Sequence, residues 1–369
     1  MIKEVKKYSV VYIINNLGFG GAQKIQTFLA NKSVGVFEKI TIVTLFDKEN
    51  MFFIDDEINV INLEFQFGYR SLLSKISFYI KMVRKLRKVL LSIKPDLVVS
   101  FSYQEVLLIK VAYILKKTKV VGSERYNPYG LTKMSKFMNK TIFGLVNHMV
   151  VQVPDLKLFY ANVRNLTVIP NPYFSNNEDS PCKIVREKTI VTASARFEHR
   201  KGIDILLKAF NIIQKEYPDY QLKIYGSGQL ETEYKRIITE LDIKNVYILP
   251  PSKNIIQLVK CCEIFVLPSR EEGMPNVLIE AMSIGIPCIS TNCPPGGPKY
   301  LSNNQTRVLL YEVENYQELA MKIKLIINNK ELSNSLSENG TELKRILNPT
   351  IIFEQWLRVF FTVLEEKNE

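Results

Sequence analysis

Residues 268–292, PSREEGMPNVLIEAMSIGIPCISTN, hold the pattern that decides the fold. The apolar run before it, residues 263–267, predicts a buried strand, and residues 276–284 predict a helix. Pro275 suits the start of that helix, because the first residues of a helix have no partner for an N–H group. Open α/β sheets bind ligands where a strand ends and a helix begins. The segment therefore predicts both a fold class and the place of a binding site.

Two carboxylates frame this predicted loop and helix. Glu272 falls on the loop, and Glu280 lies eight positions further on, within the helix. Paired carboxylates at such a place can accept hydrogen bonds from the vicinal hydroxyls of a sugar. A solvated helix face would show the same two residues, so the segment alone leaves both interpretations open.

The same alternation of short apolar runs and amphipathic stretches extends over all 369 residues, a length that favours two domains. Strands that are apolar on both faces and separated by helices predict parallel sheets covered on each side. We expect two doubly wound, Rossmann-like α/β domains that face a cleft, with the last helix packing back on the N-terminal domain. The predicted parts are an N-terminal domain over 1–172, a linker over 173–187, a C-terminal domain over 188–348 and a returning helix over 349–369.

Glycines follow the first predicted strand, in NNLGFGGAQKIQTFLA. Gly20 and Gly21 precede a helix, where the backbone can approach a ligand closely and the helix N-terminus favours negative charge. A tight turn explains the glycines equally well. The spacing matches neither the dinucleotide fingerprint G-x-G-x-x-G nor a Walker GK[ST] motif, which argues against a dinucleotide-binding or ATP-binding fold.

Two cations follow the first strand of the second half. Arg196 comes just after that strand, and Lys201 stands at the start of the next helix. A guanidinium fork and an ammonium together suit a diphosphate, although an ordinary pair of surface cations is the alternative.

Five short motifs occur in a fixed order along the chain: GGAQ (20–23), IPNP (169–172), ARFEHRKG (195–202), YGSG (225–228) and EGMPNVLIEAM (272–282). This order resembles the retaining, nucleotide-sugar-dependent glycosyltransferases of family 4, which have the GT-B fold. The resemblance covers nearly the whole chain. Its most specific part is EGMPNVLIEAM, which is similar to the E-x7-E motif of that family.

The resemblance implies a role for each motif. It implies three catalytic residues that act on the donor sugar and the departing diphosphate: Glu272, Arg196 and Lys201. It also implies a donor site formed by these residues: Gly20, Gly21, Gly273, Met274, Pro275, Asn276 and Glu280. In such a site Glu280 binds the ribose, and Gly20 and Gly21 lie near the phosphates. No metal ion or other cofactor is required in such a site, because the leaving group is stabilised by the cations.

One departure from the family lies in the N-terminal half. Some relatives carry a histidine near the donor sugar, where this chain has Glu124 and Arg125 after the strand 119–123. Both are candidates for contacts with acceptor or donor, and a structural role in the loop is the alternative.

Charge is distributed unevenly. Residues 1–175 contain 25 Lys and Arg against 12 Asp and Glu, whereas the rest contain 24 against 25. The basic half predicts a polyanionic partner.

Residues 70–94 form an amphipathic helical pattern with eight cations and no acid, and 131–140 mixes Met, Phe and Lys, which suits an anionic bilayer surface. The cations predicted to contact a membrane or a lipid diphosphate are Lys75, Lys81, Arg84, Lys85, Arg87 and Lys88. Nucleic acid is not expected, since no recognition module is visible.

The start of the chain, MIKEVKKYSVVYII, shows no cleavage pattern of a signal peptide, and no apolar run reaches the about 18 residues of a membrane span. We expect a cytoplasmic enzyme, peripheral on the inner face of the cell membrane.

The expected function is metal-independent, retaining transfer of a hexose or N-acetylhexosamine from a UDP-linked donor to a growing polyprenyl-diphosphate-linked glycan. Two alternatives remain. One is a sugar-nucleotide epimerase of the same architecture, against which the presence of only two histidines counts. The other is a sugar-nucleotide binder without catalytic activity.

Overall fold

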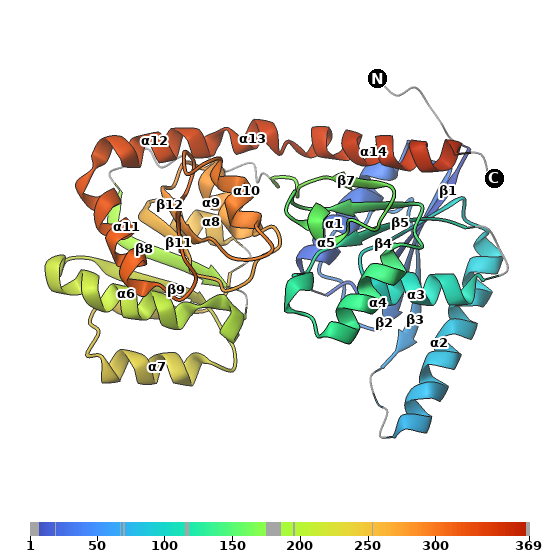
Figure 1. The fold of residues 1–369 in the computed structure, drawn as a ribbon, viewed down its shortest axis with the longest axis horizontal. Coiled ribbons are helices and arrows are strands. Elements are labelled where there is room, and N and C mark those ends of the chain that lie inside the picture. The colour runs from blue at the N-terminus through green and yellow to red at the C-terminus, as the bar shows by residue number, and fades with distance from the viewer. Residues whose placement is uncertain are drawn as a thin grey trace. The chain divides into compact units, whose positions relative to one another are not determined.

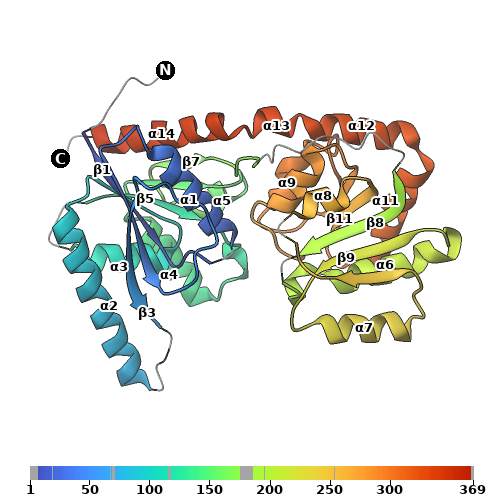
Figure 2. The ribbon, with the colours of Figure 1, turned by 180° about the vertical axis from the view of Figure 1, so that it is seen from behind.

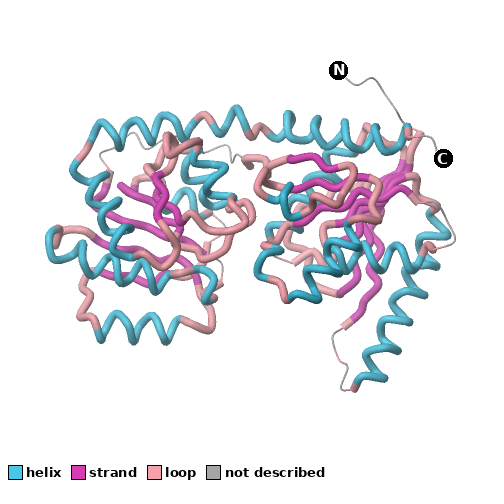
Figure 3. Tube along the Cα trace, in the orientation of Figure 1, coloured by secondary structure: helices cyan, strands magenta, loops and turns pink. Residues whose placement is uncertain are grey.

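The computed structural model describes residues 7–18, 20–66, 68, 71–114, 118–174, 186–194, 196–252 and 254–366. The chain forms two compact units (Figure 1). The first consists of Met1–Ile169 together with Ile352–Glu369, and the second of Pro170–Ile351. Most of the predicted linker over 173–187 lies outside the described residues. Strands and helices alternate through both units, as the colouring by secondary structure shows (Figure 3).

The first unit is built on a seven-stranded parallel sheet in the order β3-β2-β1-β4-β5-β6-β7. Its strands are β1 (Ser9–Ile14), β2 (Lys39–Phe46), β3 (Asn59–Phe65), β4 (Leu97–Ser100), β5 (Lys119–Glu124), β6 (His148–Val151) and β7 (Leu166–Val168). Its helices are α1 (Gly21–Ser33), α2 (Leu72–Ile93), α3 (Tyr103–Ala112), η1 (Pro128–Gly130), α4 (Lys133–Phe143), α5 (Leu156–Phe159) and α14 (Pro349–Glu365). The strand order reverses between β1 and β4, which is where doubly wound sheets bind ligands.

Helix α14 carries the end of the chain back to the first unit (Figure 2). Its indole Trp356 is fully buried and stacks on Phe101 with ring centroids 5.6 Å apart. The ammonium of Lys119 on β5 donates hydrogen bonds of 2.8 Å to the carbonyl oxygens of Leu364 and Glu366. The prediction that the last helix packs on the N-terminal domain is therefore confirmed.

The second unit contains a six-stranded parallel sheet in the order β10-β9-β8-β11-β12-β13. Its strands are β8 (Glu187–Ser194), β9 (Gln221–Gly226), β10 (Val246–Leu249), β11 (Cys262–Leu267), β12 (Cys288–Thr291) and β13 (Leu309–Tyr311). Its helices are η2 (His199–Lys201), α6 (Ile203–Glu216), α7 (Glu231–Glu240), α8 (Ile255–Val259), α9 (Asn276–Ser283), α10 (Gly297–Ser302), α11 (Tyr316–Asn328), α12 (Lys330–Thr341) and α13 (Leu343–Ile346). Together the two units confirm the predicted pair of doubly wound, Rossmann-like domains.

The structure differs from the sequence prediction in the details of some helices. Residues 199–201 form a 3-10 turn, and α6 begins only at Ile203, because Gly202 interrupts the helix with a left-handed φ of 63°. The short helices α5 and α10 were not expected, since four and six residues are too few to show helical periodicity. After residue 315 the structure has four helices, α11 to α14, and the side chain of Asn329 caps the start of α12.

Candidate active site

The centre of the second sheet determines which predicted site residues meet. Strands β8 and β11 are parallel neighbours, with Ile190 beside Ile264 and Val191 beside Phe265. Because the carboxyl ends of parallel strands lie at the same edge of a sheet, the loops after β8 and β11 leave the sheet side by side. The first loop carries the predicted diphosphate cations, and the second carries the first glutamate of the E-x7-E motif.

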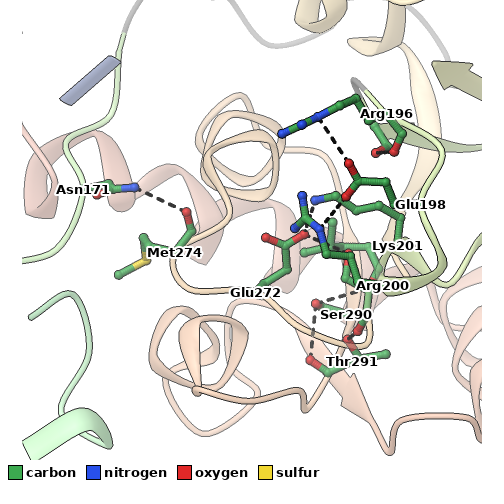
Figure 4. A network of polar contacts seen from close by, with 12 residues as sticks. Asn171, Arg196, Glu198, Arg200, Lys201, Glu272, Met274, Ser290 and Thr291 are labelled. Atoms are coloured by element: carbon green, nitrogen blue, oxygen red, sulfur yellow. Dashed lines mark hydrogen bonds and ion pairs between the residues drawn. The ribbon is translucent and has the colours of Figure 1, made fainter. Parts of the chain in front are cut away.

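Lys201 and Glu272 form an ion pair across these two loops (Figure 4). The ammonium nitrogen lies 2.6 Å from Oε1 of Glu272, and the side chains are only 18% and 12% exposed. The hydroxyl of Ser269 donates to the same Oε1 at 2.9 Å. The two charged residues are 71 positions apart in sequence. The structure thus brings together two residues that the sequence singled out separately, in surroundings where charge is weakly screened.

Gly202 lets the turn with Lys201 approach the end of β11. A Cβ atom at this position would lie 2.0 Å from the carbonyl oxygen of Pro268, and the backbone is in the left-handed region. Only glycine meets both conditions. The place of the lysine opposite Glu272 therefore depends on this close approach of two backbones.

Arg196 lies on the same loop without contacting Lys201. Its Nε is 3.5 Å from Oε1 of Glu198, whose Oε2 lies 2.6 Å from Nε of Arg200 (Figure 4). Burial opposes ionisation of Glu198, but the hydrogen bond and charge of Arg200, with the charge of Arg196, lower the pKa of that carboxyl. The Arg196 side chain is 67% exposed. Its predicted role at a diphosphate stays a prediction.

The E-x7-E segment is placed as the sequence predicted, with Glu272 on the loop and Glu280 half-buried in α9. Met274 and Pro275 are buried, and Pro275 stands directly before the helix. Gly273 lies against α10, where a Cβ on Gly297 would come within 1.9 Å of the Gly273 carbonyl oxygen. The roles of these residues in binding a donor stay predictions.

Asn171 is a residue whose part in this loop the sequence did not reveal. Its side-chain amide donates to Oδ1 of Asn276 at 2.8 Å and to the carbonyl oxygen of Met274 at 3.3 Å. Asn171 of the IPNP motif therefore hydrogen-bonds to the turn over 273–276, which precedes α9 (Figure 4). The motif itself was visible in sequence, but the contact spans more than a hundred positions.

In the first unit, Gly20 directly precedes α1, and Gly21 is the first residue of that helix. Glu105, on α3, is a buried carboxyl that sequence reasoning missed. It accepts hydrogen bonds from the Ser100 hydroxyl at 2.7 Å and from the backbone N–H of Asn15, which opens the glycine loop. Burial raises its pKa to about 7. Its signal in the sequence is one acid at the start of the otherwise apolar segment 105–109, in the helix that follows β4.

Glu124 and Arg125 make their described contacts within the first unit. The Glu124 side chain is 3% exposed and accepts hydrogen bonds from the backbone N–H groups of Arg125 and Tyr126 and from the Asn139 amide. The Arg125 guanidinium lies 4.3 Å from the Phe101 ring centroid, and burial lowers its pKa to about 9. These contacts show a structural role, the alternative that the sequence left open. Contact with a substrate stays a prediction.

Comparisons with known proteins agree with this architecture. A family described as "Glycosyl transferases group 1" matches residues 175–343. An uncharacterized glycosyltransferase of Haemophilus influenzae is 26% identical over 353 residues, which are 94% of this chain and 98% of the relative. A GalNAc-α-(1->4)-GalNAc-α-(1->3)-diNAcBac-PP-undecaprenol α-1,4-N-acetyl-D-galactosaminyltransferase of Campylobacter jejuni is 27% identical over 362 residues, 97% of this chain and 99% of the relative.

Solved structures show the same fold over the whole chain. Sucrose-phosphate synthase of Thermosynechococcus elongatus has a TM-score of 0.81 at 16% identity and covers 98% of this chain and all of its own. HepE of Anabaena, solved with UDP and glucose, has a TM-score of 0.76 at 16% identity, with 96% of this chain and 99% of its own covered. Residues 175–343 therefore form a glycosyltransferase group 1 domain, the chain has the GT-B fold, and the protein is a glycosyltransferase.

Proposed function

We propose that this glycosyltransferase is a retaining enzyme of family 4. It transfers a hexose or N-acetylhexosamine from a UDP-linked donor to a glycan carried on a polyprenyl diphosphate. The observation that carries the proposal is the Lys201–Glu272 pair at the carboxyl ends of β8 and β11. The Campylobacter relative is named for transfer to an undecaprenol-linked glycan, and HepE was solved with UDP, which supports this choice of acceptor and donor.

The proposed chemistry is electrostatic stabilisation of the leaving diphosphate. Negative charge builds on the phosphate as the sugar departs, and cations already held in place stabilise that charge without reorganisation. Lys201 is such a cation, because Glu272 and the turn around Gly202 hold it. In this proposal the exposed Arg196 binds the same diphosphate as a second cation. No metal ion is required for this step.

The two glutamates have different roles in the proposal. Glu280 accepts hydrogen bonds from the ribose hydroxyls. The Lys201 and Ser269 side chains both donate to Oε1 of Glu272. In the proposal, Oε2 of Glu272 accepts a hydrogen bond from a hydroxyl of the donor sugar and so orients that sugar. The acceptor hydroxyl attacks from the side that the diphosphate leaves, and the leaving phosphate takes its proton. The new bond therefore keeps the α configuration of the donor.

This function is tested by incubating the protein with UDP-sugars and polyprenyl-diphosphate glycans, with and without EDTA. We expect release of UDP, an α-linked product by NMR and the same rate when EDTA is present. A β-linked product would show inversion, and loss of activity in EDTA would show dependence on a metal ion. Interconversion of the donor sugar without an acceptor would favour an epimerase, and binding without turnover would favour a binder.

We further propose that the first unit docks on an anionic membrane. The first turns of α2 expose Leu72, Leu73 and Ile76 together with Lys75, and the exposed cations Lys81 and Arg84 follow along the helix. Figures 1 and 2 both show this end of α2 projecting beyond its sheet. Exposed apolar side chains among cations are typical of surfaces that lie at the boundary of lipid head groups. Among the described residues, no helix is long and apolar enough to span a bilayer.

The predicted cations do not contribute equally to this surface. Lys75, Lys81, Arg84, Lys85 and Lys88 are exposed on α2. Of these, Lys85 donates to the carbonyl oxygen of Leu63 at 2.7 Å, and the half-buried Arg87 donates to that of Ala112 at 2.9 Å. Helix α4 adds exposed apolar side chains: Met134, Phe137 and Met138.

Replacing Lys75, Lys81, Arg84 and Lys88 by glutamine is expected to weaken binding to vesicles that contain anionic lipid on the order of 10³-fold at low salt, since each cation near the surface contributes about 1 kcal/mol. Vesicle sedimentation at increasing salt measures this. The matched control replaces four lysines of the second unit: Lys235, Lys244, Lys322 and Lys330. Equal binding to neutral and anionic vesicles, or an equal loss in the control, would contradict the proposal.

A further inference from the structure

Arg270 is a nearly buried cation between the two loops of the candidate site, and no motif of the sequence includes it. Its side chain is only 12% exposed. The guanidinium donates to both carboxylate oxygens of Asp204, at 2.9 and 2.7 Å, and to both of Glu314. It also donates to the carbonyl oxygen of His199 at 2.6 Å. Five acceptor atoms on three residues thus converge on one side chain.

The contacts of Arg270 surround the turn that carries Lys201. The carbonyl oxygen of His199 accepts from its guanidinium, and that of Arg200 accepts from its backbone N–H at 2.8 Å. Both carbonyls directly precede Lys201 on η2. Asp204 lies just beyond this turn, in the first turn of α6. Arg270 therefore holds the Lys201 turn from both sides, while its own backbone belongs to the loop of Glu272.

We propose that Arg270 is a positioning residue for glycosyl transfer, which sets the place of the Lys201 ammonium against Glu272. This inference rests on the function proposed above for Lys201 and Glu272. A displacement of about 1 Å in a catalytic group can cost on the order of 10²-fold in rate. The residue type matters because a guanidinium presents five donors in a rigid plane, whereas the ammonium of a lysine presents three on a flexible stem.

The contacts between Arg270 and its carboxylate partners favour the charged form of both Arg270 and Asp204. Its hydrogen bonds to Asp204, and then to Glu314, raise its pKa above the ordinary value of arginine. Burial opposes ionisation of Asp204, but the hydrogen bond and charge of Arg270 lower the pKa of that carboxyl. Arg270 and Asp204 are therefore both charged at neutral pH, and their contact does not depend on a proton.

A double-mutant cycle tests the proposal. Arg270→Lys keeps the charge and removes the planar fork, and Lys201→Met removes the group that we propose is positioned. We expect Arg270→Lys alone to lower kcat about 10- to 10²-fold with little change in the KM for the acceptor. In the Lys201→Met background we expect the same substitution to change kcat less than about threefold. Arg236→Lys is the matched control, since Arg236 bonds Glu233 and Glu240 on the exposed face of α7.

The outcomes separate this inference from the proposed function. If Lys201→Met leaves transfer unchanged, the proposed site is wrong and the role of Arg270 falls with it. If Lys201→Met impairs transfer and Arg270→Lys costs the same factor in both backgrounds, the positioning role is overturned while the site stands. If Arg270→Lys does not fold, as measured by thermal unfolding, Glu314→Gln takes its place in the cycle. Glu314→Gln removes only the more exposed of the two carboxylates that accept from Arg270. We expect it to lower kcat by a smaller factor, and this effect must also be absent in the Lys201→Met background.

Discussion

Replacement of Lys201 by methionine is expected to lower kcat/KM for glycosyl transfer on the order of 10²- to 10³-fold. This range corresponds to about 3–4 kcal/mol, the usual cost of removing one preorganised group that stabilises charge in a transition state. The position is favourable for such an effect, because the Lys201 and Glu272 side chains are mostly shielded from water. Methionine keeps the length and most of the volume of the side chain, so the loss reports the charge.

The measurement must separate lost catalysis from the cost of leaving Glu272 without its partner. Lys201→Met combined with Glu272→Gln removes both charges, and thermal unfolding of the single and double variants shows how much stability each loses. Lys208→Met is the matched control, since this lysine is exposed on α6. A fall of less than about threefold in Lys201→Met, or an equal fall in the control, would show that Lys201 does not stabilise the leaving group.

The sequence allowed the individual site residues to be predicted, but not all of their contacts. Lys201 and Glu272 were found because each lies in a short motif. Their contact depends on β8 being next to β11, although β9 and β10 lie between them in sequence. Arg270 was missed for the same reason, since its acceptors lie 44 to 71 positions away. A single arginine in a loop has no local pattern that distinguishes it from a surface cation.

The fold was more predictable than the site, because buried parallel strands leave a strong local signal. The predicted strand over 263–267 lies within β11, and the helix over 276–284 matches α9 within one residue. The burial of Glu124 and Arg125 was harder to predict, because two charged residues at a strand end are usually solvated. They are buried here because Asn139, Phe101 and Trp356 supply a hydrogen bond and two aromatic rings.

Trp356→Ala is expected to lower the free energy of unfolding of the first unit by about 3–5 kcal/mol, the range for removing a large buried aromatic side chain. The indole is fully buried, stacks on Phe101 and lies 5.7 Å from Phe360 between ring centroids. The Arg125 guanidinium also lies over this ring, with its Cζ atom 5.4 Å from the ring centroid. The substitution therefore opens a cavity beside a buried cation and weakens the attachment of α14.

Urea unfolding, followed by a signal from the first unit, measures this loss. Trp356→Phe keeps an aromatic ring for Phe101 and Arg125, so we expect it to lose less than half as much stability as Trp356→Ala. Leu158→Ala is the control, because this leucine is 83% exposed and its replacement should change stability by about 0.5 kcal/mol or less. A loss below about 1 kcal/mol in Trp356→Ala would mean that the first unit does not depend on α14. The core of this unit would then be complete without the end of the chain, contrary to the packing of Trp356 against Phe101 and Arg125.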